Sequence, residues 1–183
     1  MNVVFIDIDG PILPLRMWAA AENIRLLDEK VIDRSPRLRF DPGCVGLIVR
    51  LCDLSDARLV LASNWRRTWA HGLDALHAKI IAEGLRADLW HENWMLPVLN
   101  NKTTELASWI SSNTIAAGVF IDDEPISTPE PVRMITVSED EGFGLSAYRS
   151  ALDIFGVVDP RDKHIKILAG KAHTRTDKSY LKR

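Results

Sequence analysis

Three apolar runs of the sequence end in side chains that could carry out chemistry. They are residues 3–6 before Asp7 and Asp9, residues 59–62 before Ser63 and Asn64, and residues 118–121 before Asp122 and Asp123. Lys102 lies between the second and third runs. Because the carboxyl ends of parallel strands share one sheet edge, where ligands bind, we expect these groups to meet there. Acid pairs, a hydroxyl and a lysine together predict a site for Mg²⁺-dependent phosphoryl transfer.

Asp7 and Asp9 are the candidate catalytic residues. Residues two apart in an extended segment point the same way, so both carboxylates can reach one phosphate. Asp7 can attack phosphorus and form an aspartyl-phosphate, while Asp9 can protonate the leaving oxygen and then activate water. Gly10 permits a tight turn there. A single acid after a strand is often only a cap or turn residue, and the recurrence of polar groups at two other strand ends favours catalysis.

Ser63, Asn64 and Lys102 are the candidate phosphate-binding residues. The Ser63 hydroxyl and backbone amide can contact phosphate oxygens, and Asn64 can add a donor. Lys102 can neutralise charge on the phosphate and on the nucleophile. Each has an ordinary alternative when taken alone: a turn for Ser63 and Asn64, and a solvated side chain at a helix start for Lys102.

Asp122 and Asp123 are candidate metal ligands. Two adjacent acids after four apolar residues are costly to bury unless a cation compensates them. Mg²⁺ prefers hard oxygen ligands and typically takes one or two carboxylates, a phosphate oxygen and waters. We therefore predict that Asp7, Asp122 and the backbone carbonyl of Asp9 bind Mg²⁺. Asp123 is expected to bind it through water or to brace a neighbour.

The apolar patterns predict alternating strands and helices. Strands are expected at residues 2–8, 58–62, 87–90, 117–121 and 132–137, and helices from Pro42, at 67–83, from Thr103 or Thr104 onward, and at 146–155. This order indicates an α/β, Rossmann-like three-layer sandwich with a parallel sheet of about five strands. Residues 10–40, with a short helix expected near 18–27, and residues 84–101 exceed ordinary loop lengths, so they are expected to select the substrate.

Composition predicts one folded domain with a basic tail. The chain has 183 residues, of which 46% are hydrophobic, and a formal net charge of -2, which argues against a wholly basic nucleic-acid binder. The domain is expected at residues 1–158. Residues 159–183 carry eight Lys or Arg against three Asp. This excess predicts either contact with a polyanionic partner or a flexible, solubilising end.

Cys44 and Cys52 are the two cysteines, and their spacing supports neither a disulfide framework nor a zinc site. The first residues run directly into a strand without a signal-peptide pattern, and no apolar stretch reaches membrane-spanning length. We therefore expect a cytoplasmic protein that does not enter the membrane. The sequence leaves the oligomeric state open.

As an ordered set, the clusters resemble the four motifs of the haloacid dehalogenase (HAD) superfamily of hydrolases. The matching residues are Asp7 with Asp9, Ser63, Lys102, and Asp122 with Asp123, within a match from residue 2 to about residue 156. In this superfamily, an acid two residues after the nucleophile marks phosphatases, so Asp9 implies phosphomonoester hydrolysis. Pro11 stands where the family usually has Thr or Val, which implies altered loop geometry without loss of activity.

The chain is also similar in three places to compact HAD domains associated with RNA repair. These places are residues 61–65 (LASNW), 121–124 (IDDE) and 144–146 (GLS). Such domains carry little or no cap, and the resemblance implies an open site for a bulky substrate such as a nucleic-acid end. Trp65, Trp90 and Trp94 are candidates for stacking on bases, with a place in the core as the alternative. Arg66 is a further candidate substrate contact.

The predicted function is that of a Mg²⁺-dependent phosphomonoesterase that acts through an aspartyl-phosphate on a nucleotide or a polynucleotide 3′-phosphate. A small metabolite or a phosphoprotein is an alternative substrate, and an acceptor other than water is a further possibility. A non-catalytic binding module on a HAD scaffold is the alternative from another class. Since every motif residue is present, the sequence favours an enzyme.

Overall fold

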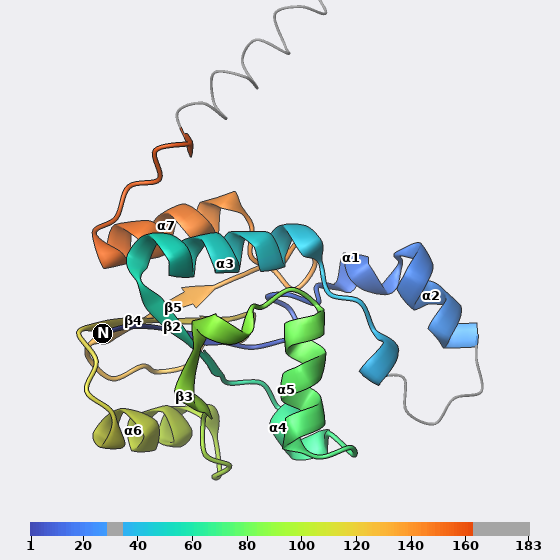
Figure 1. Ribbon diagram of the computed structural model, residues 1–183, viewed down its shortest axis with the longest axis horizontal. Coiled ribbons are helices and arrows are strands. Elements are labelled where there is room, and N and C mark those ends of the chain that lie inside the picture. Colours follow the sequence, from blue (N-terminus) through green and yellow to red (C-terminus); the bar gives the residue numbers. More distant parts are fainter. Residues whose placement is uncertain (29–34, 163–183) are drawn as a thin grey trace, which may run out of the picture.

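The computed structural model of the protein describes residues 1–28 and 35–162. These residues form a parallel sheet with strand order β3-β2-β1-β4-β5 and helices on both faces (Figure 1). The strands are β1 (Asn2–Ile6), β2 (Ala57–Leu61), β3 (Trp90–Met95), β4 (Ala117–Asp122) and β5 (Val132–Thr136). The predicted α/β sandwich is therefore confirmed.

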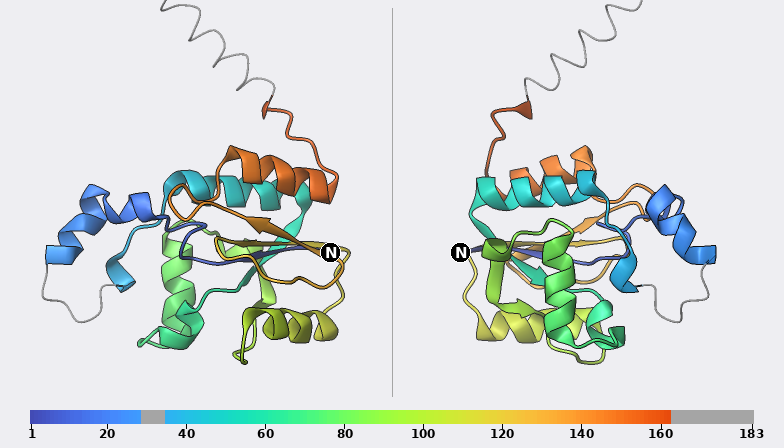
Figure 2. Two further views of the ribbon diagram at one scale, coloured as in Figure 1. Left: turned by 180° about the vertical axis from the view of Figure 1, so that it is seen from behind. Right: turned by 45° about the vertical axis from the view of Figure 1, so that its right-hand side comes forward.

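Helices cover the two faces of the sheet in separate layers. They are α1 (Leu15–Trp18), α2 (Ala21–Asp28), α3 (Pro42–Ser55), α4 (Trp65–Thr68), α5 (Leu73–Ala82), α6 (Lys102–Ser112) and α7 (Leu145–Phe155), with short 3-10 helices at Ser35–Arg37 and Ala87–Leu89. Figure 2 shows α3 and α7 on one face, α5 and α6 on the other, and α1 with α2 beyond the carboxyl edge. None of the described helices is long and apolar enough to cross a membrane.

The central strand β1 is apolar on both faces because both are covered. Phe5 packs on one side in a cluster with Trp109 of α6, and the two ring centroids are 5.2 Å apart. Ile6 points to the other side and joins a cluster that contains Ile48 of α3. A strand buried on both faces reads as a continuous apolar run, which is why β1 was recognisable in the sequence.

Two helix starts are set by side-chain caps. Asp41 accepts hydrogen bonds from the backbone N–H groups of Gly43 and Cys44 at 2.8 and 2.9 Å, which confirms the predicted start of α3. Asn101 accepts from the N–H of Thr104 at 2.9 Å, so α6 begins at Lys102, slightly earlier than predicted. This cap places Lys102 in the first turn of its helix.

Several predicted boundaries are wrong. The helix expected at residues 67–83 is divided into α4 and α5, because the backbone becomes extended at Trp69, with a ψ of 114°, and resumes a helix only after Gly72, with a φ of 83°. The strand expected at 87–90 is a 3-10 helix, and β3 follows it at Trp90–Met95 with a register shift against β2. β1 ends at Ile6, and the helix expected near 18–27 is the separate pair α1 and α2.

The first residues of the predicted tail, 159–162, pack against the folded domain. Asp159 is buried and accepts hydrogen bonds from Arg50 and from the Tyr148 hydroxyl, the latter at 2.7 Å. Asp162 pairs with Arg149 at 2.6 Å. The basic segment that follows, residues 163–183, lies outside the described residues.

Candidate active site

Strand register brings the predicted groups together. Ile6 of β1 pairs with Leu61 of β2 and with Ile121 of β4, so the residues after these three positions share one edge. The Asp7 N–H donates to the Ile121 carbonyl at 3.1 Å, and the Ala62 N–H donates to the Ile6 carbonyl at 2.8 Å. Because both neighbours of β1 are parallel to it, Asp7 lies between the Ser63 loop and the acids of β4.

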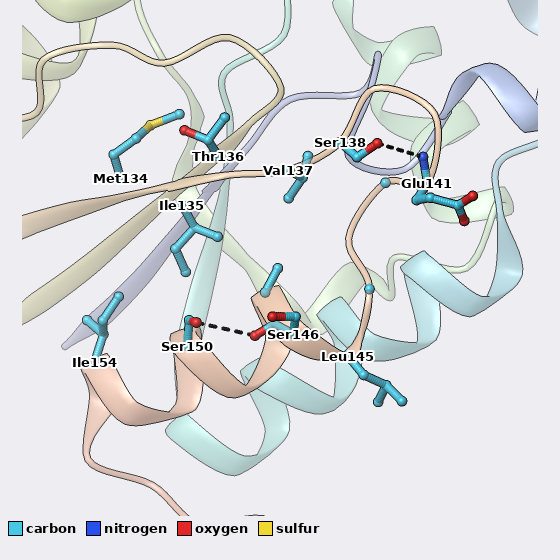
Figure 3. A pocket seen from close by; sticks show the side chains of 13 residues that line it. Met134, Ile135, Thr136, Val137, Ser138, Glu141, Leu145, Ser146, Ser150 and Ile154 are labelled. Atoms are coloured by element: carbon cyan, nitrogen blue, oxygen red, sulfur yellow. Dashed lines mark hydrogen bonds between the residues drawn. The ribbon is translucent and has the colours of Figure 1, made fainter.

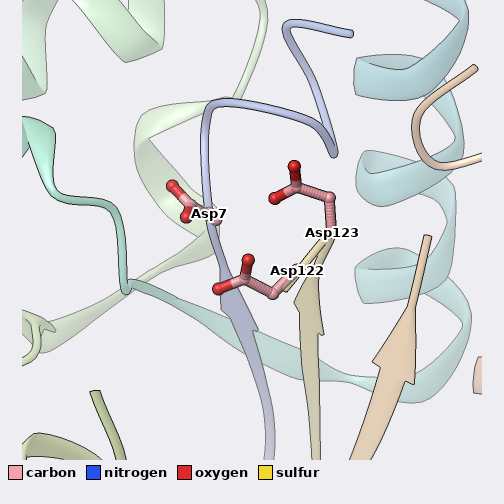
Figure 4. Close-up of side chains that lie close together, drawn as sticks. All are labelled: Asp7, Asp122 and Asp123. Atoms are coloured by element: carbon pink, nitrogen blue, oxygen red, sulfur yellow. The ribbon is translucent and has the colours of Figure 1, made fainter. Parts of the chain in front are cut away.

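Three acids converge at this edge. Asp7, Asp122 and Asp123 each offer a carboxylate oxygen, and these oxygens lie within 4.8 Å of one another (Figure 4). Asp7 and Asp122 are buried, and burial together with the charge of Asp7 raises the pKa of Asp122. Hard oxygen donors so placed, in need of a compensating cation, fit Mg²⁺. The Asp9 carboxylate is not part of this cluster.

Gly10 allows the cluster to form. Its φ is 80°, and a Cβ atom built there would lie only 2.5 Å from Cγ of Asp123. The turn after the first acid pair therefore needs glycine for its backbone conformation and for the close approach of Asp123.

Lys102 pairs with two of the acids. Its Nζ forms an ion pair with Asp7 and lies 2.5 Å from Oδ2 of Asp122, with 10% of the side chain exposed. Burial works against the lysine charge, but Asp7 and Asp122 outweigh it, and the pKa of Lys102 is raised above its usual value. The ammonium group is therefore held charged beside the candidate nucleophile.

The Ser63 loop follows β2. Ser63 is buried, and its Oγ accepts a hydrogen bond from the Trp65 N–H at 3.3 Å. Asn64 is exposed and directly precedes α4. The structure thus places Ser63 and Asn64, the two candidate phosphate-binding residues of this loop, at the edge that carries Asp7.

Arg66 supports this loop from within, which corrects its expected place at the substrate. Its guanidinium donates to the carbonyl groups of Ala62, Ser63 and Leu96 at 3.2, 2.8 and 2.6 Å. It also forms an ion pair with Glu105, in which both side chains are fully buried. With its donors bound inside the protein, Arg66 has none to offer a substrate.

Asp9 is exposed and has a tryptophan partner. Its Oδ2 accepts a hydrogen bond of 2.8 Å from Nε1 of Trp65. Desolvation at the site, followed by the charge of Asp7, raises the pKa of Asp9 to about 6, although the indole N–H acts in the opposite direction. A pKa near neutral suits a group that gives up and regains a proton during turnover.

The candidate stacking tryptophans contact protein side chains. Trp65 stacks on Trp69 with centroids 5.5 Å apart, and Trp90 is buried with its Nε1 donating to a backbone carbonyl. Trp94 is half-buried and stacks on His77 at 4.4 Å. Trp65 and Trp90 therefore belong to the core, the alternative to base stacking, because their rings are buried.

A groove of about 570 Å³ lies elsewhere, between β5 and α7 (Figure 3). Ile135, Val137 and Ile154 supply apolar lining, while Ser138 and Ser146 add hydroxyl groups. None of the candidate site acids, Asp7, Asp9, Asp122 and Asp123, lines this groove, nor does Lys102. The candidate active site is therefore set at the open sheet edge and not in this groove.

The segment before α7 supports the turn after Asp9, and sequence reasoning missed this contact. The Phe143 N–H donates to the carbonyl of Pro11 at 2.9 Å, which ties the segment before α7 to the turn after Asp9. Gly142, with a φ of 73°, approaches the same turn so closely that a Cβ atom would lie 2.9 Å from the Pro11 oxygen. The glycine itself was the available signal, since such approaches exclude side chains.

Comparison with known proteins identifies a family for the chain. A family model described as the HAD domain in Swiss Army Knife RNA repair proteins matches residues 3–148. No curated protein and no solved structure was found to match the chain. The match covers the three strand ends and Lys102, that is, every group assembled at the site. The chain therefore belongs to the family of HAD domains found in Swiss Army Knife RNA repair proteins.

Proposed function

We propose that the chain is a Mg²⁺-dependent phosphomonoesterase that acts through an aspartyl-phosphate on a nucleotide or polynucleotide phosphate, with a polynucleotide 3′-phosphate as the leading candidate. Family membership indicates a phosphatase or phosphoesterase of the HAD type. The observation that carries the proposal is the convergence of Asp7, Asp122 and Asp123 at one sheet edge, where Lys102 forms ion pairs with the first two.

In the proposed reaction, Asp7 attacks phosphorus while the Ser63 loop and Lys102 hold phosphate oxygens. Asp9 gives its proton to the leaving oxygen and then takes one from the water that releases phosphate from Asp7. Mg²⁺, held by the Asp7 and Asp122 carboxylates with Asp123 beside them, would neutralise phosphate charge and orient the group for attack.

The small size of the segment after Asp9 supports a bulky substrate. Among the described residues, this segment contributes the short helices α1 and α2, which lie beyond the carboxyl edge of the sheet (Figure 1), and the 3-10 helix at Ser35–Arg37. An open edge can admit the end of a polymer, and the family description, RNA repair, points to the same class. A small metabolite or a phosphoprotein would use the same chemistry, so substrate comparison must separate these cases.

Phosphate release tests the proposal. The wild type should hydrolyse para-nitrophenyl phosphate with Mg²⁺ and not with chelator, and Asp7→Asn should abolish release while remaining folded. Asp53→Asn, at an acid exposed on the surface and paired with Arg86, is the matched control and should retain activity. Release from 3′-phosphorylated oligonucleotides should then exceed release from sugar phosphates and phosphopeptides. The reverse order would refute the polynucleotide assignment.

The basic tail is proposed to contact a nucleic-acid substrate, on the strength of its excess of Lys and Arg. Removal of residues 163–183 should weaken hydrolysis of phosphorylated oligonucleotides and leave that of para-nitrophenyl phosphate unchanged. Equal rates on both substrates before and after removal would assign the tail no such role.

A further inference from the structure

The Trp65 indole contacts the side chain proposed to move protons. Its Nε1 lies 2.8 Å from Oδ2 of Asp9, and it is the one side-chain donor to this carboxyl group among the described residues. An indole N–H can only donate. Oδ2 therefore accepts from the indole whether Asp9 is charged or neutral. Because the carbonyl oxygen of a neutral carboxyl group is a stronger acceptor than its hydroxyl oxygen, this contact favours the neutral form that carries the proton on Oδ1.

The ring that makes this contact is held firmly. Trp65 is 8% exposed, stacks on Trp69 with an interplanar angle of 19°, and meets the edge of Phe40 at 5.9 Å. Its backbone N–H donates to the Ser63 hydroxyl at 3.3 Å. One residue thus contacts both the phosphate-binding loop and Asp9, and packing leaves its indole little freedom to rotate.

We infer that Trp65 is a positioning residue for proton transfer: it anchors Oδ2 of Asp9 and leaves Oδ1 to exchange the proton with the leaving group and with water. The inference rests on the proposed function. As Asp7 forms its bond to phosphorus, the bond to the leaving oxygen breaks and that oxygen takes the Oδ1 proton. In hydrolysis, water bonds to phosphorus, the Asp7–phosphorus bond breaks, and Oδ1 takes a water proton.

Trp69 provides a matched control in the same stack. Its Nε1 is buried and has no hydrogen-bond partner within the described part of the chain. Trp65→Phe and Trp69→Phe each remove one indole N–H and keep an aromatic ring. Only the first removes a hydrogen bond to Asp9, so the two variants separate loss of positioning from loss of packing.

The experiment measures kcat/KM for phosphate esters whose leaving groups range from para-nitrophenol to simple alcohols. An alcohol needs its proton at the moment of bond breaking, whereas para-nitrophenolate departs readily without one. Trp65→Phe should therefore lower kcat/KM for alkyl esters by about ten- to a hundredfold, the range of one hydrogen bond to a charged group. The same variant should lower kcat/KM for para-nitrophenyl phosphate much less. Trp69→Phe should show no dependence on the leaving group.

A uniform loss across the series in Trp65→Phe, matching that of Trp69→Phe, would overturn the inference and leave the phosphatase function intact. Absence of phosphate release by the wild type would instead overturn the proposed function, and the inference with it. If Trp65→Phe does not fold, benzothienylalanine at position 65 keeps the ring shape and replaces the N–H by sulfur. The same dependence on the leaving group is expected, and its absence there is equally decisive.

Discussion

Arg66 and Glu105 form a buried ion pair that joins two parts of the candidate active site. Nη2 of Arg66 lies 2.8 Å from Oε2 of Glu105, and both side chains are fully buried. Arg66 also holds the Ser63 carbonyl at 2.8 Å, and Glu105 follows Lys102 by one turn of α6. The pair therefore fixes the phosphate-binding loop relative to the lysine that contacts the nucleophile.

Removal of Glu105 should be strongly destabilising. Glu105→Ala leaves the Arg66 charge buried without its carboxylate, which typically costs about 3–5 kcal/mol. Urea unfolding should show this loss, and the folded fraction should have reduced phosphatase activity. Glu92→Ala, at an exposed position of β3, should change stability by less than about 0.5 kcal/mol. Equal effects of the two substitutions would mean that the pair does not support the loop.

Substitution of Gly10 should impair catalysis. In Gly10→Ala the new Cβ would lie 2.5 Å from Cγ of Asp123. The alanine backbone would also have to adopt the φ of 80°, which side-chain-bearing residues rarely do. Displacement of the acid cluster by about 1 Å can lower turnover by about a hundredfold. Gly46→Ala, inside α3 with no atom within 4 Å of the new Cβ, should instead raise the free energy of unfolding by about 0.5–1 kcal/mol. Undiminished turnover in Gly10→Ala would contradict the geometry of the turn.

Asp122 should make the metal-free protein less stable. Burial and the charge of Asp7 raise its pKa, so the charged form is disfavoured in the folded state at neutral pH. Asp122→Asn should therefore raise the melting temperature in the presence of chelator. Mg²⁺ should raise the melting temperature of the wild type, because it binds the folded state, and should not raise that of the variant. A variant that is less stable without metal would refute the electrostatic argument.

Asp159 should stabilise the protein above acidic pH. The Arg50 guanidinium holds the pKa of this carboxyl group well below its usual range, so ionisation favours the folded state. Its contribution is complete above the unfolded-state pKa of about 3.9 and is lost as pH falls further. The difference in unfolding free energy between wild type and Asp159→Asn should thus shrink on acidification from neutral pH to about pH 3. A difference that stays constant would contradict this.

Much of the candidate site was predictable because strand ends are visible in the sequence. The apolar run of β1 stops where Asp7 begins, and the run of β4 leads into the acid pair at Asp122. In a parallel sheet, these ends share an edge whatever the detailed packing. The fold class and the meeting of the candidate catalytic acids at one edge follow from that rule, and the family match bears out the fold class.

The roles of Trp65 and Arg66 were not predictable in the same way. Both follow Ser63 and looked available to a substrate, but α4 is a single short turn whose direction is set by tertiary contacts. That direction brings the indole N–H of Trp65 to Asp9 and buries Arg66 against Glu105. The division between α4 and α5 is not visible in the sequence because the apolar spacing continues across it. The backbone becomes extended at Trp69, which ends α4, and Gly72, with a φ of 83°, precedes α5.

Chemical trapping of the aspartyl-phosphate is the most direct test of the central claim. Enzyme turning over an aryl phosphate with Mg²⁺ would be quenched and reduced with borohydride, which converts a phosphorylated aspartate to homoserine. Peptide mass spectrometry should find homoserine at position 7, and neither the chelator-treated enzyme nor Asp7→Asn should yield it. Turnover by the wild type without modification at position 7 would contradict the account, because phosphate would then leave the substrate without passing through Asp7.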